Sequence, residues 1–268
     1  MRPLALIAVN VFRESVRDKV LYNLVAFALL LIGASYLIGQ LTAGQDVKII
    51  KDLGLAATSV FGLFIAIFIG IGLVSKEVEK RSIYSLLSKP ITRPQLVVGK
   101  YAGLVLTLAV NLSVMAIALY AVLAYMSWGA SARLIASWER PALDALLLRA
   151  FFLTFVELAF VTAIALFFST FSTPLLSAAL TFGFFVAGRF SADLRNFDQA
   201  VNSPVAAWFA KALYWVLPNL GSFDVRSQVV HGQPVTAGYM ALVTGYGALY
   251  IAALLIAATV IFSRRDFK

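Results

Sequence analysis

Six long runs of apolar residues dominate the sequence and limit what the chain can fold into. A helix needs about 20 mostly apolar residues to cross a hydrocarbon layer about 30 Å thick. A water-soluble domain of 268 residues has too little interior to hide a content of 61% hydrophobic residues. We therefore expect an all-α, polytopic membrane protein with six transmembrane helices, at residues 20–41, 53–75, 101–127, 145–170, 171–188 and 236–263.

The fourth and fifth runs are separated only by a short turn rich in Ser and Thr, around Ser169–Pro174. Proline is tolerated in the first turn of a helix but disturbs the interior of one. The sequence therefore predicts a tight hairpin at this turn rather than one continuous helix.

Basic residues gather on one side of the six runs. Residues 1–19, 76–100 and 264–268 together contain thirteen Lys and Arg but only five Asp and Glu, whereas the other connections are nearly balanced. Because cytoplasmic loops carry the Lys and Arg excess, we predict that both termini face the cytoplasm and that the chain lies in the cytoplasmic (inner) membrane. The net charge of +9 then reflects these loops, and no nucleic-acid partner is expected.

Residues 1–19 have a helical pattern that is too amphipathic to cross a bilayer. Apolar residues recur with helical spacing from Leu4 to Val11, and Arg13 and Glu14 fall on the opposite face. This pattern predicts an interfacial helix, which serves either as a plain membrane anchor or as a lever that touches a cytoplasmic partner.

The connection 191–233, on the outer side, is long and contains a second helical pattern. Ser203-Pro204 is a typical helix start, and Trp208 and Trp215 follow it. Since Trp is enriched at the membrane interface, we expect a helical insertion at the outer leaflet, which either closes the bundle or guides a substrate.

The connection 76–93 is the most densely charged part of the sequence. Its charged residues flank a short apolar stripe of Ile83, Leu86 and Leu87, and Pro90 ends the helical pattern. A short amphipathic helix of this kind is typical of one that docks in a groove on another protein. The alternative is a loop that folds back on its own bundle.

The stretch Leu73–Arg93, followed by Gly99 and Lys100, resembles the signature of ABC-2-type permeases. These are the six-span membrane subunits of type V ATP-binding-cassette (ABC) transporters. The stretch is most similar to the multi-copper-enzyme-maturation branch, which includes the nitrous-oxide reductase accessory permease. In this family the helix between the second and third spans is a coupling helix seated in a cleft of a cytoplasmic ATPase. The resemblance implies that the ATPase-coupling residues are Glu77, Arg81, Leu86, Leu87, Pro90 and Arg93.

The chain lacks the G-x-x-x-x-G-K-[ST] motif that binds ATP phosphates, and the nearest match, at 97–101, lacks the first glycine and the hydroxyl. We therefore expect a permease subunit that is not an enzyme and has no catalytic residue, metal site or cofactor of its own. The resemblance implies ABC ATPase subunits that bind ATP and Mg, and a second copy or a paralogue of the permease. The alternatives are an ATP-independent channel or carrier, or a membrane scaffold for an extracytoplasmic protein.

One acidic residue, Glu157, falls deep inside an apolar run. A carboxylate at this depth must be paired, protonated or in contact with water, and Asn111 is a candidate partner at similar depth in the third run. Two interpretations stay open: contact with substrate or protons, and a hydrogen bond to a neighbouring helix.

Small residues repeat at every fourth position in two of the runs, a spacing that lets helices approach closely. We expect the first set to pack within the bundle and the second to contribute to a subunit interface. The two sets are Gly62, Ala66 and Gly70, and Ala179, Gly183 and Ala187.

Overall fold

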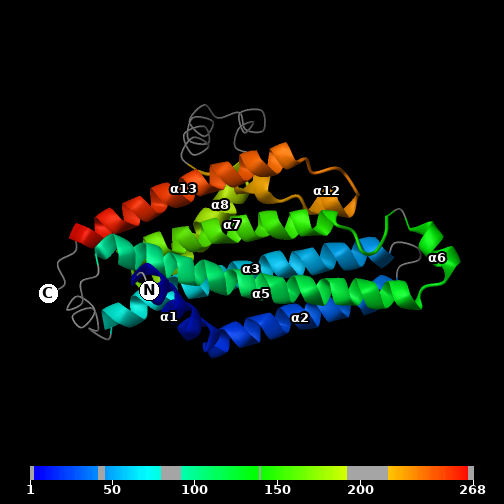
Figure 1. Cartoon of the computed structure of the whole chain (residues 1–268), viewed down its shortest axis with the longest axis horizontal. Coiled ribbons are helices and arrows are strands. Elements are labelled where there is room, and N and C mark those ends of the chain that lie inside the picture. Colours follow the sequence, from blue (N-terminus) through cyan, green and yellow to red (C-terminus); the bar gives the residue numbers. More distant parts are fainter. Residues whose placement is uncertain (1–2, 42–45, 80–91, 139, 192–216, 265–268) are drawn as a thin grey trace, which may run out of the picture.

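In the computed structural model, long helices run along a common axis and form an elongated bundle (Figure 1). The structure describes residues 3–41, 46–79, 92–138, 140–191 and 217–264, and this part of the chain contains no strand. The elements are α1 Pro3–Val16, α2 Lys19–Gln40, α3 Asp46–Glu79, α5 Arg93–Gly129, α6 Ala132–Ser137, α7 Leu146–Ser169, α8 Pro174–Arg189, the 3₁₀ helix η1 Leu220–Phe223, α12 Arg226–Val230 and α13 Ala237–Arg264.

Five of these helices, α2, α3, α5, α7 and α13, are long and apolar enough to cross a membrane. They coincide with five of the six predicted runs, and the expectation of an all-α, polytopic membrane protein is confirmed. The helices α3 and α5 contain 34 and 37 residues. At 1.5 Å per residue they measure roughly 51 and 56 Å, well beyond the thickness of the hydrocarbon core.

The predicted fifth span is present as α8, but it is shorter than a full crossing. α8 begins at Pro174, as the predicted hairpin requires, and ends after 16 residues. This gives a length of roughly 24 Å, below the 30 Å or so of the hydrocarbon core. The predicted span 171–188 thus corresponds to a shorter apolar helix, which ends in an arginine that pairs inside the bundle.

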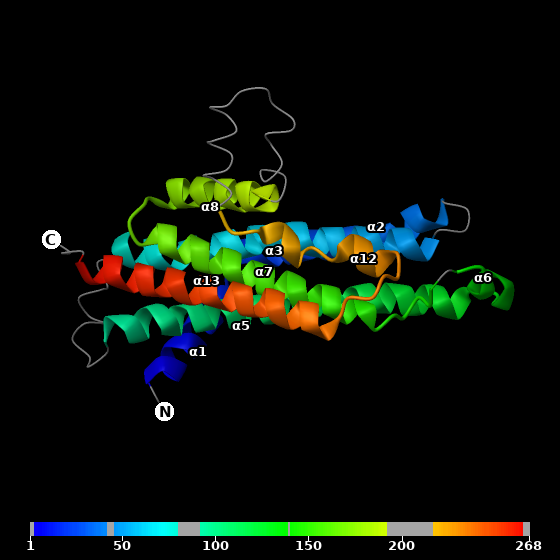
Figure 2. The same cartoon turned by 90° about the horizontal axis from the view of Figure 1, so that it is seen from above.

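Residues 217–236 run back along the bundle beside α7 and include η1 and α12 (Figure 2). We call them the return segment. Arg140 Nη2 donates to the Gly232 carbonyl at 2.7 Å, and Arg149 Nη1 donates to the Val235 carbonyl. Gly232 has a positive φ of 69°, and a Cβ atom at this position would lie 2.4 Å from Arg140 Nε. The glycine therefore permits both the turn and the close approach of Arg140. The predicted outer helix that starts at Ser203-Pro204 lies outside the described residues.

α7 is the central helix and contacts α3, α5, α8, η1, α12 and α13. The amphipathic α1 packs its apolar face on α5, where Gly99 lies against Ile7 and Gly103 against Val11. The start of α1 and the end of α13 lie at the same end of the bundle, opposite α6 (Figure 1). This arrangement agrees with an even number of crossings.

Candidate functional site

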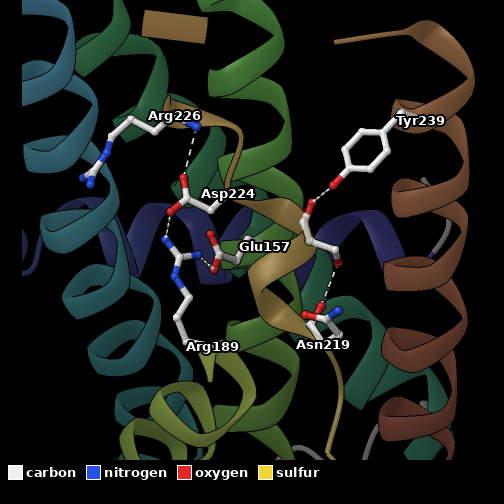
Figure 3. A network of polar contacts seen from close by, with 7 residues as sticks. Glu157, Arg189, Asn219, Asp224, Arg226 and Tyr239 are labelled. Atoms are coloured by element: carbon white, nitrogen blue, oxygen red, sulfur yellow. Dashed lines mark hydrogen bonds and ion pairs between the residues drawn. The ribbon is translucent and has the colours of Figure 1, made fainter. Parts of the chain in front are cut away.

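The candidate site is a network of charged side chains around Glu157, at the middle of α7 (Figure 3). The Glu157 side chain is only 2% exposed, and its Oε1 accepts a hydrogen bond from Arg189 Nη1 at 2.5 Å. Arg189 is the last residue of α8, so α8 ends at the depth of the middle of α7. A basic residue at the C-terminal end of a helix also interacts favourably with the helix dipole.

Arg189 contacts a second carboxylate, that of Asp224, which directly follows η1. Arg189 Nη2 donates to Asp224 Oδ2 at 2.6 Å. The two segments approach closely because Gly188 has no side chain: a Cβ atom there would lie 2.9 Å from the Leu220 side chain and 3.0 Å from the Pro218 carbonyl oxygen. Arg189 therefore joins α7, α8 and the return segment.

The network continues to α3 through Arg226. The backbone N–H of Arg226 donates to Asp224 Oδ1 at 3.1 Å, and its Nε lies 3.1 Å from Asp52 Oδ1. Exposure rises along the chain of contacts, from 2% for the side chain of Glu157 to 33% for Asp224 and 49% for Asp52. The charges thus lead from the centre of the bundle to the surface of α3.

The arrangement is suited to binding helices together and less suited to chemistry on a substrate bond. An ion pair in the bundle interior is attractive only while both charges and their hydrogen bonds are in place. Since the network joins α3, α7, α8 and the return segment, a shift of α3 against α7 must alter at least one of its contacts. Among the described residues, no group of three or more potential metal ligands lies together.

The structure does not join Glu157 to Asn111, the candidate partner named from the sequence. Asn111 Nδ2 donates instead to the Thr107 carbonyl of its own helix at 2.7 Å. Arg189 was missed as a partner because it directly follows the predicted fifth span and was placed in the outer connection. The signal in the sequence is an apolar run of marginal length that ends in an arginine.

The small residues of α3 lie against α7. A Cβ atom on Gly62 would lie 2.4 Å from Leu158 Cδ1, and one on Gly70 would lie 2.6 Å from Ala165 Cβ. Ala66, between them, is fully buried. The second set behaves differently, because Ala179 and Gly183 of α8 are exposed and a Cβ atom on Gly183 would meet nothing within 4 Å.

Comparison with protein-family models matches residues 5–267 to the family described as ABC-2 family transporter protein. The chain belongs to this family. It is the permease component of an ABC transporter, and the resemblance in the sequence is confirmed at this level. No curated protein matches the ABC-2 permease chain significantly.

The predicted coupling residues of this ABC-2 permease lie largely outside what the structure describes. Arg81, Leu86, Leu87 and Pro90 lie outside the described residues, and Glu77 lies in α3 with a side chain that is also outside them. Arg93 is the first residue of α5. Its Nη1 donates to the Phe262 carbonyl at 3.2 Å and to the Ser263 carbonyl, at the C-terminal end of α13.

Arg93 therefore ties the start of α5 to the end of α13. The next turns of α5 contact α1 through Gly99 and Gly103. In the ABC-2 permease, the first and last helices, α1 and α13, thus both contact α5 near its start, which follows the connection 80–91. A displacement of this part of α5 acts directly on α1 and α13.

Proposed function

We propose that the chain is the transmembrane subunit of an ABC transporter in which separate ATPase subunits hydrolyse ATP and drive transport across the cytoplasmic membrane. Two copies, or one copy and a paralogue, form the transmembrane part. The exposed small residues of α8, among them Ala179 and Gly183, support a contact between subunits. The finer resemblance to the nitrous-oxide reductase accessory branch stays a prediction.

The continuity of α3 and α5 is the observation that carries this proposal. Both helices extend without interruption from the outer end of the bundle to the end where the termini lie, and they flank residues 80–91 (Figure 1). Rigid helices of this length transmit a displacement of the connection into the bundle, since α3 packs tightly on α7. The charge network, which includes Asp52 of α3 and Glu157 of α7, must respond to such a movement.

In the proposed cycle, ATP with Mg binds only to the ATPase subunits, since the chain has no phosphate-binding motif of its own. Closure of the ATPases pushes the connection 76–93 and shifts α3 and α5. The network then opens and reforms as the transmembrane part alternates between two arrangements. The permease itself performs no bond chemistry.

Replacing the apolar stripe of the connection tests the coupling. We expect the double variant Leu86→Asp/Leu87→Asp neither to stimulate ATP hydrolysis by the ATPase nor to co-purify with it. Two carboxylates cannot be buried in an apolar groove without a large cost. The matched control is Ser85→Asp/Ser88→Asp, which adds the same charge to neighbouring positions outside the stripe. If both double variants retain and stimulate the ATPase as the unmodified chain does, the proposed coupling is incorrect.

A further inference from the structure

A cleft of about 490 Å³ lies on the other side of η1 from Glu157, between the residues around η1 and the outer half of α13. This volume is in the range typical of small-molecule sites. Figure 3 shows two of its residues, Asn219 and Tyr239, on the side of η1 away from the charge network. The lining consists of Leu217, Asn219, Ser222, Tyr239, Leu242, Val243, Tyr246 and Tyr250.

Hydrogen bonds fix the walls of the cleft. The Tyr239 hydroxyl donates to the Ser222 carbonyl at 2.6 Å, and the Asn219 backbone N–H donates to the Tyr246 hydroxyl oxygen at 2.9 Å. The rings of Tyr246 and Tyr250 are in contact, with centroids 4.9 Å apart. The cleft is therefore formed without a ligand.

The lining selects the chemistry of a ligand. None of its eight residues is charged, and an unpaired ligand charge would be costly to bury among them. The side-chain oxygen of Asn219 is buried, so the part of Asn219 that faces the cleft adds no charge to it. The tyrosine rings offer flat apolar faces together with hydroxyl groups.

The position of the cleft indicates where such a ligand comes from. Leu242 is 76% exposed and marks the edge of the cleft on the outward face of the membrane-crossing α13. We propose that the cleft binds the hydroxyl-bearing head group of an uncharged amphiphile from the surrounding bilayer. The apolar tail of this ligand stays in the lipid beside α13. This inference concerns binding alone and goes beyond the proposed ATP-driven function.

Photoaffinity labelling of the chain in phospholipid vesicles, without any ATPase, tests the inference. The probe is an alkyl glucoside with a diazirine in its tail, and mass spectrometry locates the labelled peptides. We expect saturable labelling within residues 239–250 that unlabelled alkyl glucoside suppresses. Probes with the same tail and a trimethylammonium or sulfate head group are expected to label this segment without saturation.

Two exposed leucines of α13 provide a matched pair of variants. Leu242→Trp fills the edge of the cleft and is expected to abolish saturable labelling, whereas Leu249→Trp is the control. Leu249 is 74% exposed, lies two helical turns further along the same face and does not line the cleft. Both positions are exposed, so neither change disturbs the core.

Equal labelling by the charged probes, or equal labelling of the Leu242→Trp and Leu249→Trp variants, would overturn the proposal. Neither result bears on ATPase coupling, which the Leu86 and Leu87 variants test separately.

Discussion

Arg189 is shared between two carboxylates, and its loss leaves Glu157 without its cationic partner in the centre of the bundle. Removing one member of a buried ion pair costs about 3–5 kcal/mol. Because the Arg189 side chain is 25% exposed, we expect a smaller loss of about 2–3 kcal/mol for Arg189→Gln. Thermal unfolding of the purified chain measures this as a lower transition temperature.

The double variant Glu157→Gln/Arg189→Gln is the control for this prediction. It removes both charges and leaves neutral groups that can hydrogen-bond, so we expect it to be more stable than Arg189→Gln alone. If the losses in stability of Glu157→Gln and Arg189→Gln simply add up to the loss of the double variant, the pair does not stabilise the bundle.

The sequence singled out the residue Glu157 but not the side chains that contact it. A single acidic residue in an apolar run is conspicuous, and the cost of burying it predicts that a partner exists. The arginine at the end of a short apolar run is the signal for this partner, but the contacts themselves depend on the fold, because Arg189 is 32 positions from Glu157 and 35 from Asp224. Asn111 matched Glu157 in depth but bonds within its own helix.

Among the helices, the contact of α3 with α7 depends on the absence of side-chain atoms at two glycines. Gly70→Ala places a Cβ atom 2.6 Å from Ala165 Cβ, an atom without side-chain torsions that could move it away. The helices must separate, and we expect a loss of about 1–3 kcal/mol in the free energy of unfolding, as for other overpacked interiors. Thermal unfolding with tryptophan fluorescence checks this value.

Gly72→Ala is the matched control, two positions further along the same helix. A Cβ atom there would meet nothing within 4 Å, and alanine favours a helix over glycine by up to about 1 kcal/mol. We expect this variant to be as stable as the unmodified chain or more stable. Equal destabilisation by both substitutions would contradict close packing at Gly70 as the cause.

Helix positions were predicted well from hydropathy, but the lengths of α3 and α5 were not. α7 lies within one residue of the predicted run 145–170 at both ends, because its apolar residues and its helix end together. α3 and α5 extend past the apolar runs, since charged residues such as Asp46 and Arg93 continue a helix outside the bilayer. Hydropathy reports where the membrane ends, whereas helix termini depend on caps such as the Thr92 N–H bond to Gln95.

For the whole molecule, we expect the fifth crossing to be a composite of α8 and residues 217–235. α8 covers the half of α7 nearest the start of α1 and the end of α13, and residues 217–235 extend from the depth of Asp224 to contacts with Arg140 and Arg149 at the opposite end. The sequence could not predict this division, because an apolar run of 18 residues is compatible with a complete helix.

Cysteine accessibility distinguishes a composite crossing from a complete helix. The chain has no cysteine, so each single-cysteine variant reports one position. We expect Phe190→Cys to resist a membrane-impermeant maleimide from either side, because Phe190 follows the residue that pairs with Glu157 at the middle of α7. His231→Cys and Ala136→Cys, both exposed, should react from outside, and Asn10→Cys only after permeabilisation, as the positive-inside rule predicts. A complete helix over 171–188 would instead bring position 190 to the outer surface, where it would react as readily as position 231.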